Sequence, residues 1–196
     1  EKIRTNYDAN GFLTSIEKTD PANAPAWVTV YTVNSRDTFK NVSSDTDALG
    51  YTKTYVYDAL NRIAKIDHPN AGGSAVKEEF FYTNNGIPSV KIIELGRYVG
   101  KNGQNTRYYY NGNRQLSKVR DNLSQEVEYD YCRCGHMKLL IDERDKQTQW
   151  EFDLNGRVTK KTFPHGKSIQ YSYQNESGLL STVKNPNDGS ATWTQT

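Results

Sequence analysis

The 196 residues are enough for one large or two small domains, and the formal net charge of +2 predicts no nucleic-acid partner. No apolar run approaches the roughly 18 residues of a membrane-spanning helix, so we expect no membrane insertion. Fourteen Tyr and three Trp predict a folded chain with a core built on tyrosine. The chain starts at Glu1 without Met, and we therefore expect a fragment of a longer chain whose targeting signals lie elsewhere.

Pairs of aromatic residues, separated by one residue, recur along the chain at steps of 21 to 28 residues. Because side chains two residues apart on a strand share a face, each pair is expected on one face of a sheet. We predict an aromatic stack along that face. Its members are Tyr55, Tyr57, Phe80, Tyr82, Tyr108, Tyr110, Tyr129, Tyr131, Trp150, Phe152, Tyr171 and Tyr173.

A turn signal follows most of these pairs. Gly or Asn stands four residues after the second aromatic, and in several units an Asp follows that aromatic directly, which predicts a type I turn ending in a left-handed residue. The Asp carboxylate is expected to accept the amide hydrogen two residues on. The predicted turn residues are Asp8, Gly11, Asp58, Asn61, Gly86, Gly135, Asp153 and Gly156.

Each turn is followed by an alternating stretch such as "RVTKKTF" (157–163) and then by a second loop that often contains Pro or Gly. Two strands per unit predict an all-β, antiparallel fold. Residues 1–196 are expected to form a single array of eight to nine hairpin units.

The stretches "TYVYDALNRIAKIDHP" (54–69) and "TQWEFDLNGRVTKKTFPHGKSIQYSYQNESG" (148–178) closely resemble the YD-repeat, or RHS-repeat, family. That family's signature is Tyr-Asp, a short turn, Gly-Arg, a strand, and a Pro/Gly loop that leads to the next Tyr-x-Tyr-Asp. Three units depart from the pattern, since Phe12 replaces the expected Arg of the first clear unit, "YNGNR" (110–114) reads one residue short and "YQNESG" (173–178) one residue long.

The resemblance implies a continuous antiparallel ribbon of hairpins that curls into part of a spiral shell, as in bacterial RHS and wall-associated toxin-delivery proteins and in animal teneurins. It implies a structural segment of an extracellular or cell-surface bacterial shell, which encapsulates or displays a C-terminal effector. The implied partners are flanking YD repeats of the same parent chain, an encapsulated toxin domain and surface glycans.

No catalytic or cofactor-binding residues are predicted, and we do not expect an enzyme. The sequence contains no Gly-x-Ser-x-Gly, phosphate loop or His-Glu-x-x-His motif.

One turn is chemically unusual, because "YCRCGHM" (131–137) replaces the Asp and Arg of the repeat with Cys132 and His136 and adds Cys134. These three side chains are candidate ligands for zinc or copper, with a fourth donor from a neighbouring turn residue such as Asp130, Asp142 or Asp153. A Cys132–Cys134 disulfide is the second alternative. The favoured interpretation is a variant turn with free thiols and no metal.

Two other functions or architectures fit the repeats less well. A carbohydrate- or cell-surface-binding module would use exposed aromatic residues, although the chain has three Trp only. A β-propeller would need about 42 residues per blade, but consecutive units do not alternate in character as blades require.

Overall fold

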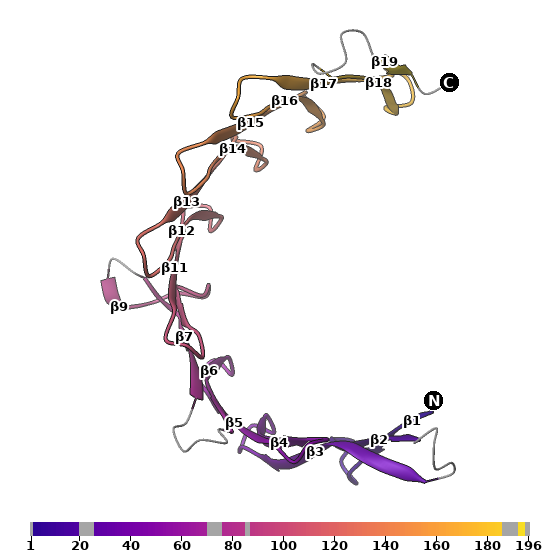
Figure 1. Cartoon of the computed structure of the whole chain (residues 1–196), viewed down its shortest axis with the longest axis vertical. Helices are drawn as coiled ribbons and strands as arrows, with labels where there is room; N and C mark the ends of the chain where they lie inside the picture. Colours follow the sequence, from indigo (N-terminus) through magenta and orange to yellow (C-terminus); the bar gives the residue numbers. More distant parts are fainter. Residues whose placement is uncertain (1, 20–25, 70–75, 85–86, 186–191, 195–196) are drawn as a thin grey trace. The chain divides into compact units, whose positions relative to one another are not determined.

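The computed structural model describes residues 2–19, 26–69, 76–84, 87–185 and 192–194. It divides into two units, Glu1–Asn105 and Thr106–Thr196. Figure 1 shows that the strands of each unit follow one another in chain order and form a single layer. The described residues contain strands, turns and loops and no α-helix, hence no helix that could span a membrane.

The first unit is an antiparallel ladder in which each strand pairs with the next in sequence from β1 to β7, and β7 then pairs with β10. A separate hairpin, β8 with β9, interrupts this order. The strands are β1 (Ile3–Tyr7), β2 (Leu13–Thr19), β3 (Trp27–Arg36), β4 (Val42–Asp47), β5 (Thr52–Tyr57), β6 (Ile63–His68), β7 (Val76–Phe81), β8 (Thr83–Asn84), β9 (Ile87–Lys91) and β10 (Arg97–Val99).

The second unit repeats the same arrangement without an insertion, since each strand from β11 to β19 pairs antiparallel with the next. The strands are β11 (Asn105–Tyr110), β12 (Leu116–Arg120), β13 (Glu126–Tyr131), β14 (Met137–Ile141), β15 (Gln147–Phe152), β16 (Val158–Thr162), β17 (Ser168–Tyr173), β18 (Leu180–Lys184) and β19 (Thr192–Thr194). The described residues are therefore all-β and antiparallel, as predicted. The number of hairpin units over residues 1–196 stays a prediction.

A single turn design connects most of these strands. At Asp58, the Oδ1 atom accepts the N–H groups of Leu60 and Arg62 at 2.9 and 3.0 Å, and the backbone carbonyl accepts the N–H of Asn61 at 3.0 Å. Because one carboxylate oxygen holds the amides two and four residues on, the turn is fixed by local sequence alone. The same side-chain bonds are formed by Asp8, Asp37, Asp47, Asn111, Asp121, Asp142 and Asp153.

The fourth turn residue has a left-handed backbone, as the sequence predicts. Gly11, Gly135 and Gly156 have φ of 82°, 89° and 78°, and Asn61 has φ of 58°. Gly86 lies outside the described residues. The second loop of a unit uses this turn as well, and Ser124 and Asp145 occupy its left-handed position without Pro or Gly. The expectation of Pro- or Gly-marked second loops therefore identifies only some of these turns.

The turn after Tyr110 has the normal length, so the prediction that it is one residue short is wrong. Asn111 takes the Asp position, with Oδ1 accepting the N–H groups of Asn113 and Gln115, both at 3.0 Å. Arg114 then occupies the left-handed position with φ of 63°. Gly112 suggested a shorter turn because it follows Tyr110 by two residues, whereas the turn glycine of other units follows the aromatic by four. The long turn is confirmed at Gly178, whose N–H donates to the carbonyl of Gln174 at 3.0 Å.

Arg114→Gly is expected to raise the free energy of unfolding by about 1 kcal/mol, because a left-handed backbone costs roughly 1–2 kcal/mol for a residue with Cβ and glycine loses part of that gain to unfolded-state entropy. Urea unfolding of the variant measures the change. Gly112→Ala in the same turn is the control and should have little effect, since Gly112 does not have a left-handed φ and a Cβ there meets nothing within 4 Å. An unchanged or lower stability of Arg114→Gly would contradict the prediction.

The described residues form no tyrosine core, so this prediction is wrong. No hydrophobic side chain among the described residues is buried, and the one buried polar side chain there is Asp45, which is 7% exposed. A single-layer sheet has solvent near both faces, so most of its side chains are half-buried or exposed. The alternation nevertheless holds in β5 and β15, where the aromatic positions are half-buried and the positions between them are exposed.

Candidate functional site

The turn at Asp153 shows the ordinary form of the repeat site. Asp153 Oδ1 accepts the N–H groups of Asn155 and Arg157, each at 2.9 Å, and Oδ2 accepts Nε of Arg157 at 2.7 Å. The backbone N–H of Arg157 is the largest influence that lowers the pKa of the Asp153 carboxyl. The carboxylate therefore fixes both the turn and the direction of the Arg157 side chain.

Arg157 also holds the next hairpin. Its guanidinium lies over the ring of Tyr173, 4.3 Å from the centroid, and Nη1 donates to the carbonyl of Gly178 at 3.1 Å. In return, the hydroxyl of Tyr173 donates to the carbonyl of Val158 at 2.8 Å. A cation over an aromatic face is worth about 0.5–1 kcal/mol at an exposed site. Neighbouring hairpins are thus joined by side chains in place of a buried core.

The first unit contains the same contact. Arg62 pairs with Asp58, lies 3.8 Å from the centroid of the Tyr82 ring, and donates to the carbonyls of Ile92 and Ile93. The Tyr82 hydroxyl donates to the carbonyl of Ile63 at 3.1 Å. The Arg that follows the turn is therefore a link between hairpins in both units.

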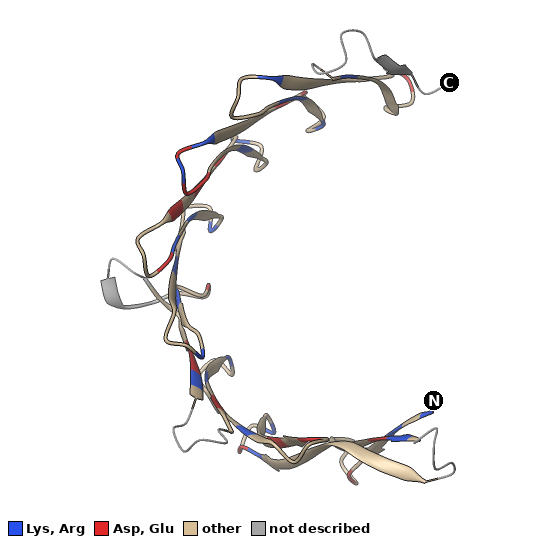
Figure 2. Cartoon of the chain, viewed as in Figure 1, with Lys and Arg blue, Asp and Glu red and all other residues tan. Residues whose placement is uncertain are grey.

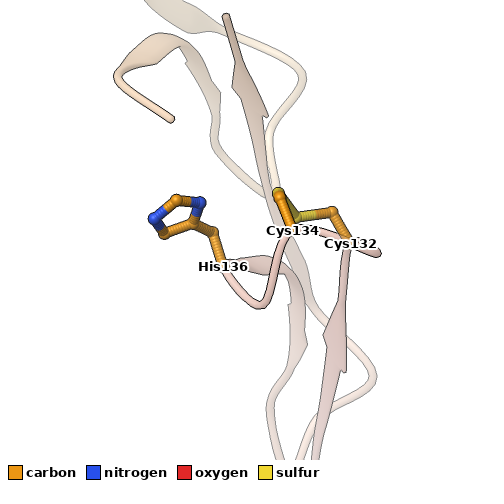
Figure 3. A group of neighbouring side chains, drawn as sticks. All are labelled: Cys132, Cys134 and His136. Atoms are coloured by element: carbon orange, nitrogen blue, oxygen red, sulfur yellow. A yellow bond between two sulfur atoms is a disulfide. The ribbon is translucent and has the colours of Figure 1, made fainter. Parts of the chain in front are cut away.

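The cysteine turn keeps the backbone of these turns and changes their side-chain chemistry. The N–H of Cys132 donates to the carbonyl of His136 at 2.9 Å, and the N–H of Gly135 donates to the carbonyl of Cys132 at 3.0 Å. Cys132 and Cys134 form a disulfide, with Cα atoms 5.2 Å apart (Figure 3). The favoured interpretation of free thiols is therefore wrong, because the turn brings the two Cα atoms within the range of about 4.4–6.8 Å that a disulfide requires.

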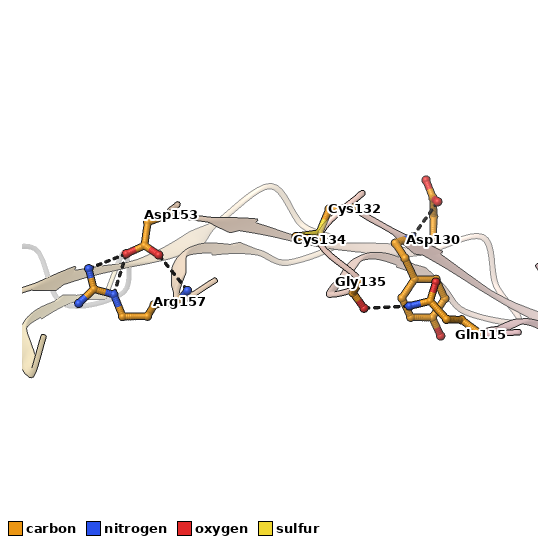
Figure 4. Close-up of a disulfide and its surroundings, with 8 residues drawn as sticks. Gln115, Asp130, Cys132, Cys134, Gly135, Asp153 and Arg157 are labelled. Atoms are coloured by element: carbon orange, nitrogen blue, oxygen red, sulfur yellow. Dashed lines mark hydrogen bonds and ion pairs between the residues drawn. A yellow bond between two sulfur atoms is a disulfide. The ribbon is translucent and has the colours of Figure 1, made fainter. Parts of the chain in front are cut away.

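His136 occupies the position of the linking Arg. Its ring stacks on Phe152 of the next hairpin, with centroids 4.9 Å apart and an interplanar angle of 22°. From the preceding hairpin, Nε2 of Gln115 donates to the carbonyl of Gly135 at 2.9 Å. Figure 4 shows the disulfide turn between the Gln115 contact and the Asp153–Arg157 pair. The variant turn thus keeps its contacts to both neighbours.

The two sulfur atoms and a ring nitrogen of His136 lie within 4.8 Å of one another. Cys134 and His136 are exposed and Cys132 is half-buried. Two thiolates and an imidazole are ligands that zinc and copper accept in proteins. In the disulfide form the sulfur atoms are bonded to each other, so these three residues do not offer two thiolates.

Residues 142–190 match the family model described as RHS Repeat. This part of the chain is an RHS repeat. The match includes the Asp153–Arg157 turn and the contact of Arg157 with Tyr173, and it confirms the resemblance that the sequence indicated. No curated protein matches the chain.

Several solved structures share the fold of the chain, among them three of TcdB2-TccC3. A crystal structure of TcdB2-TccC3-Cdc42 has a TM-score of 0.70 at 12% identity, covering 96% of this chain and 12% of that one. A structure of TcdB2-TccC3 has a TM-score of 0.69 at 13% identity, with coverage of 96% and 12%. A structure of TcdB2-TccC3 without its hypervariable C-terminal region has a TM-score of 0.68 at 11% identity, with coverage of 94% and 10%. The chain therefore spans only a small part of the length of these proteins.

The predicted aromatic residues contact cations and carbonyl groups more than one another. Besides the contacts of Tyr82, Phe152 and Tyr173, Lys161 lies 5.4 Å from the ring centroid of Trp150. The hydroxyls of Tyr57 and Tyr131 each donate to a backbone carbonyl fifteen residues earlier, at 2.8 and 2.7 Å. A continuous stack of these rings stays a prediction, whereas the hydroxyls of Tyr57, Tyr82, Tyr131 and Tyr173 each donate to a carbonyl of the preceding hairpin.

The face of the second unit opposite the paired aromatic residues carries charged side chains. A cavity of about 380 Å³ there is lined by residues of β11 to β14, among them Lys118, Glu126 and Glu128. Lys118 pairs with both glutamates, at 2.7 and 2.8 Å, and Glu126 is the larger influence that raises the pKa of the Lys118 ammonium. Within each unit, basic and acidic residues are interspersed along the strands (Figure 2).

Two polar clusters of the first unit were missed in the sequence. Asp45 accepts the hydroxyls of Tyr31 and Tyr55 at 3.2 and 2.7 Å. His68 Nε2 lies 2.6 Å from Glu78 Oε1, and Glu78 also accepts the hydroxyl of Tyr98. Asp45 stands between two polar residues in "VSSDTD" (42–47), so no local signal marks it as buried. The signal that could have found it is the pair of tyrosines on the adjoining strands.

The RHS turns are expected to lose stability in acid. The N–H of Lys146, followed by that of Arg144, lowers the pKa of Asp142. The N–H of Arg157 likewise lowers the pKa of Asp153. A carboxyl whose folded pKa is depressed contributes stability above its unfolded pKa of about 3.9, and this contribution is lost as the pH falls through the folded pKa. The free energy of unfolding should therefore be constant above about pH 5 and fall below about pH 4.

Urea unfolding across this pH range tests the prediction. Asp142→Asn is the matched control, because the amide oxygen can still accept both N–H groups but has no proton to gain. Its stability should change less between the two pH values than that of the original chain. An equal pH dependence in both proteins would contradict the assignment to the turn.

Proposed function

We propose that this chain is a structural segment of an RHS-repeat shell, outside a bacterial cell or at its surface, that encloses a C-terminal effector of the parent protein. The observation that carries the proposal is the link between consecutive hairpins, in which Arg157 binds Tyr173 and Gly178, and Tyr173 binds Val158. A ladder held by nearest-neighbour contacts can be extended by further repeats, as a wall requires.

Two further observations support the proposal. TcdB2-TccC3, which shares the fold, is described with a hypervariable C-terminal region that can be removed. The Cys132–Cys134 disulfide fits an oxidising compartment, where disulfides persist, and hence a location outside the cytosol. On this proposal the residues of the chain act by positioning neighbouring repeats and carry out no reaction, and the partners are the flanking repeats and the enclosed effector.

Electron microscopy and limited proteolysis of the full parent chain test the proposal together. The hairpins of this segment should lie in a continuous wall, and the C-terminal region should be cleaved far more slowly than the same region expressed alone. Arg62→Ala combined with Arg157→Ala should expose that region, whereas Arg107→Ala at the exposed position of β11 should not. A wall with a freely cleaved C-terminal region would mean display of the effector, and hairpins outside any wall would overturn the proposal.

A glycan array distinguishes the alternative, a glycan-binding module, from the shell segment. The aromatic rings with described contacts are half-buried and already engaged by cations or carbonyl groups. We therefore expect no strong binding on a glycan array. Tight binding that Trp150→Ala abolishes would favour the alternative in place of the shell.

A further inference from the structure

Three residues of the repeat turn lie close together in space. They are the residue that carries the turn carboxylate, here called position one, and the residues two and four further on, positions three and five. At Asp153 the side chain of position one bonds the N–H groups of positions three and five, and it pairs with the Arg157 side chain of position five at 2.7 Å. Asp58 and Arg62 show the same convergence at 2.6 Å. A side chain at position five can therefore reach a side chain at position one in this turn.

In the cysteine turn these three positions carry Cys132, Cys134 and His136. The disulfide demonstrates that position three reaches position one. The ring nitrogen of His136 is within 4.8 Å of the sulfur atoms although the ring now stacks on Phe152. His136 is exposed, so its ring can turn toward the sulfur atoms at the loss of one ring contact.

We propose that reduction of the Cys132–Cys134 disulfide converts this turn into a site for one thiophilic metal ion, with zinc as the representative. The ligands are the sulfur atoms of Cys132 and Cys134 and a ring nitrogen of His136. Zn–S bonds of about 2.3 Å in a tetrahedron place two sulfur atoms about 3.8 Å apart, so the disulfide must open before the ion binds. The metal then joins the three positions that the aspartate joins in other turns.

The fourth coordination position belongs to water. The nearby carboxylates are engaged elsewhere, since Asp130 pairs with Lys138 at 2.9 Å and Asp153 pairs with Arg157. Asp142 Oδ1 accepts the N–H groups of its own turn. These are the residues that the sequence suggested as a fourth donor. Three protein ligands and one water give an open zinc site of the Cys₂His type.

The conversion requires an external reductant, namely two molecules of a small thiol such as glutathione. The first thiolate attacks one sulfur atom and forms a mixed disulfide while the other cysteine leaves as a thiolate. The second thiolate releases the remaining cysteine and produces the oxidised dimer of the reductant. The chain gains two electrons and two protons, and the zinc ion displaces the two thiol protons when it binds.

Zinc binding to the reduced and to the oxidised chain tests the proposal. After anaerobic reduction and removal of the reductant, the chain is titrated with zinc chloride against a chromophoric chelator. We expect one zinc per reduced chain and none per oxidised chain. Bound zinc should also protect both thiols from alkylation, and X-ray absorption should show two sulfur ligands and one nitrogen ligand.

The control variant restores the ordinary turn. Cys132→Asp/Cys134→Asn/His136→Arg copies the residues at 153, 155 and 157, so it should fold and bind no zinc in either redox condition. His136→Arg alone should weaken zinc binding at least about tenfold, because one of three protein ligands is lost. Circular dichroism of each protein with and without zinc checks that the sheet persists.

The proposal fails if the folded, reduced chain binds less than one zinc. It also fails if the triple variant binds as much zinc as the reduced chain, or if His136→Arg leaves the affinity unchanged. These outcomes do not depend on the shell function, because a wall segment with an ordinary turn would serve equally well.

Discussion

Tyr55→Phe is expected to lower the free energy of unfolding by about 1.5–3 kcal/mol, the range for a hydrogen bond to a charged group. The hydroxyl of Tyr55 donates to Asp45 at 2.7 Å, and the Asp45 side chain is buried at 7% exposure. Burial, followed by this bond and the negative charge of Asp45, raises the pKa of Tyr55, so the hydroxyl keeps its proton and remains a donor. Without it, Asp45 retains the longer bond from Tyr31.

Urea unfolding of three variants separates this effect from the loss of any tyrosine hydroxyl. Tyr31→Phe should cost less than Tyr55→Phe, because its bond to Asp45 is 3.2 Å long. Tyr57→Phe removes a bond to the neutral carbonyl of Val42, for which about 0.5–1.5 kcal/mol is typical. Equal losses in all three variants would show that Asp45 does not depend on Tyr55.

Gly156→Val is expected to destabilise the chain by more than the roughly 1–2 kcal/mol that left-handed strain alone costs. Gly156 has φ of +78°, and a Cβ at this position would lie 2.6 Å from Cε1 of His136. The side chain must therefore also push the His136 ring from Phe152. Urea unfolding of the variant measures the sum of both effects.

Substitutions at two other glycines separate the left-handed strain from the steric contact with His136. Gly166 has φ of +83° with nothing within 4 Å, so Gly166→Val should show the strain alone. Gly112 has open space and no left-handed φ, so Gly112→Val should cost least. The expected order of destabilisation is Gly156→Val, then Gly166→Val, then Gly112→Val. If Gly112→Val cost as much as Gly166→Val, the left-handed turn position would not matter.

The turns and strands could be predicted from the sequence because they depend on residues close in the chain. The carboxylate of Asp153 acts on amides two and four residues away, and the left-handed position follows at Gly156. The prediction of turn length was less accurate where a turn lacks the usual Asp and Gly. Gly112 suggested a short turn, but Asn111 and Arg114 keep the normal one.

The tertiary structure decided the contacts between hairpins and the state of the cysteines. Arg157 reaches Gly178, twenty-one residues on, only because the strand register places the two turns side by side. Tyrosine content suggested a core, but one layer of strands leaves the paired aromatic rings half-buried, so cations and carbonyl groups take the place of a second layer. The sequence left free thiols, a disulfide and a metal as alternatives at Cys132 and Cys134, since their distance depends on how the turn folds. The bend places their Cα atoms 5.2 Å apart, and that distance permits the disulfide.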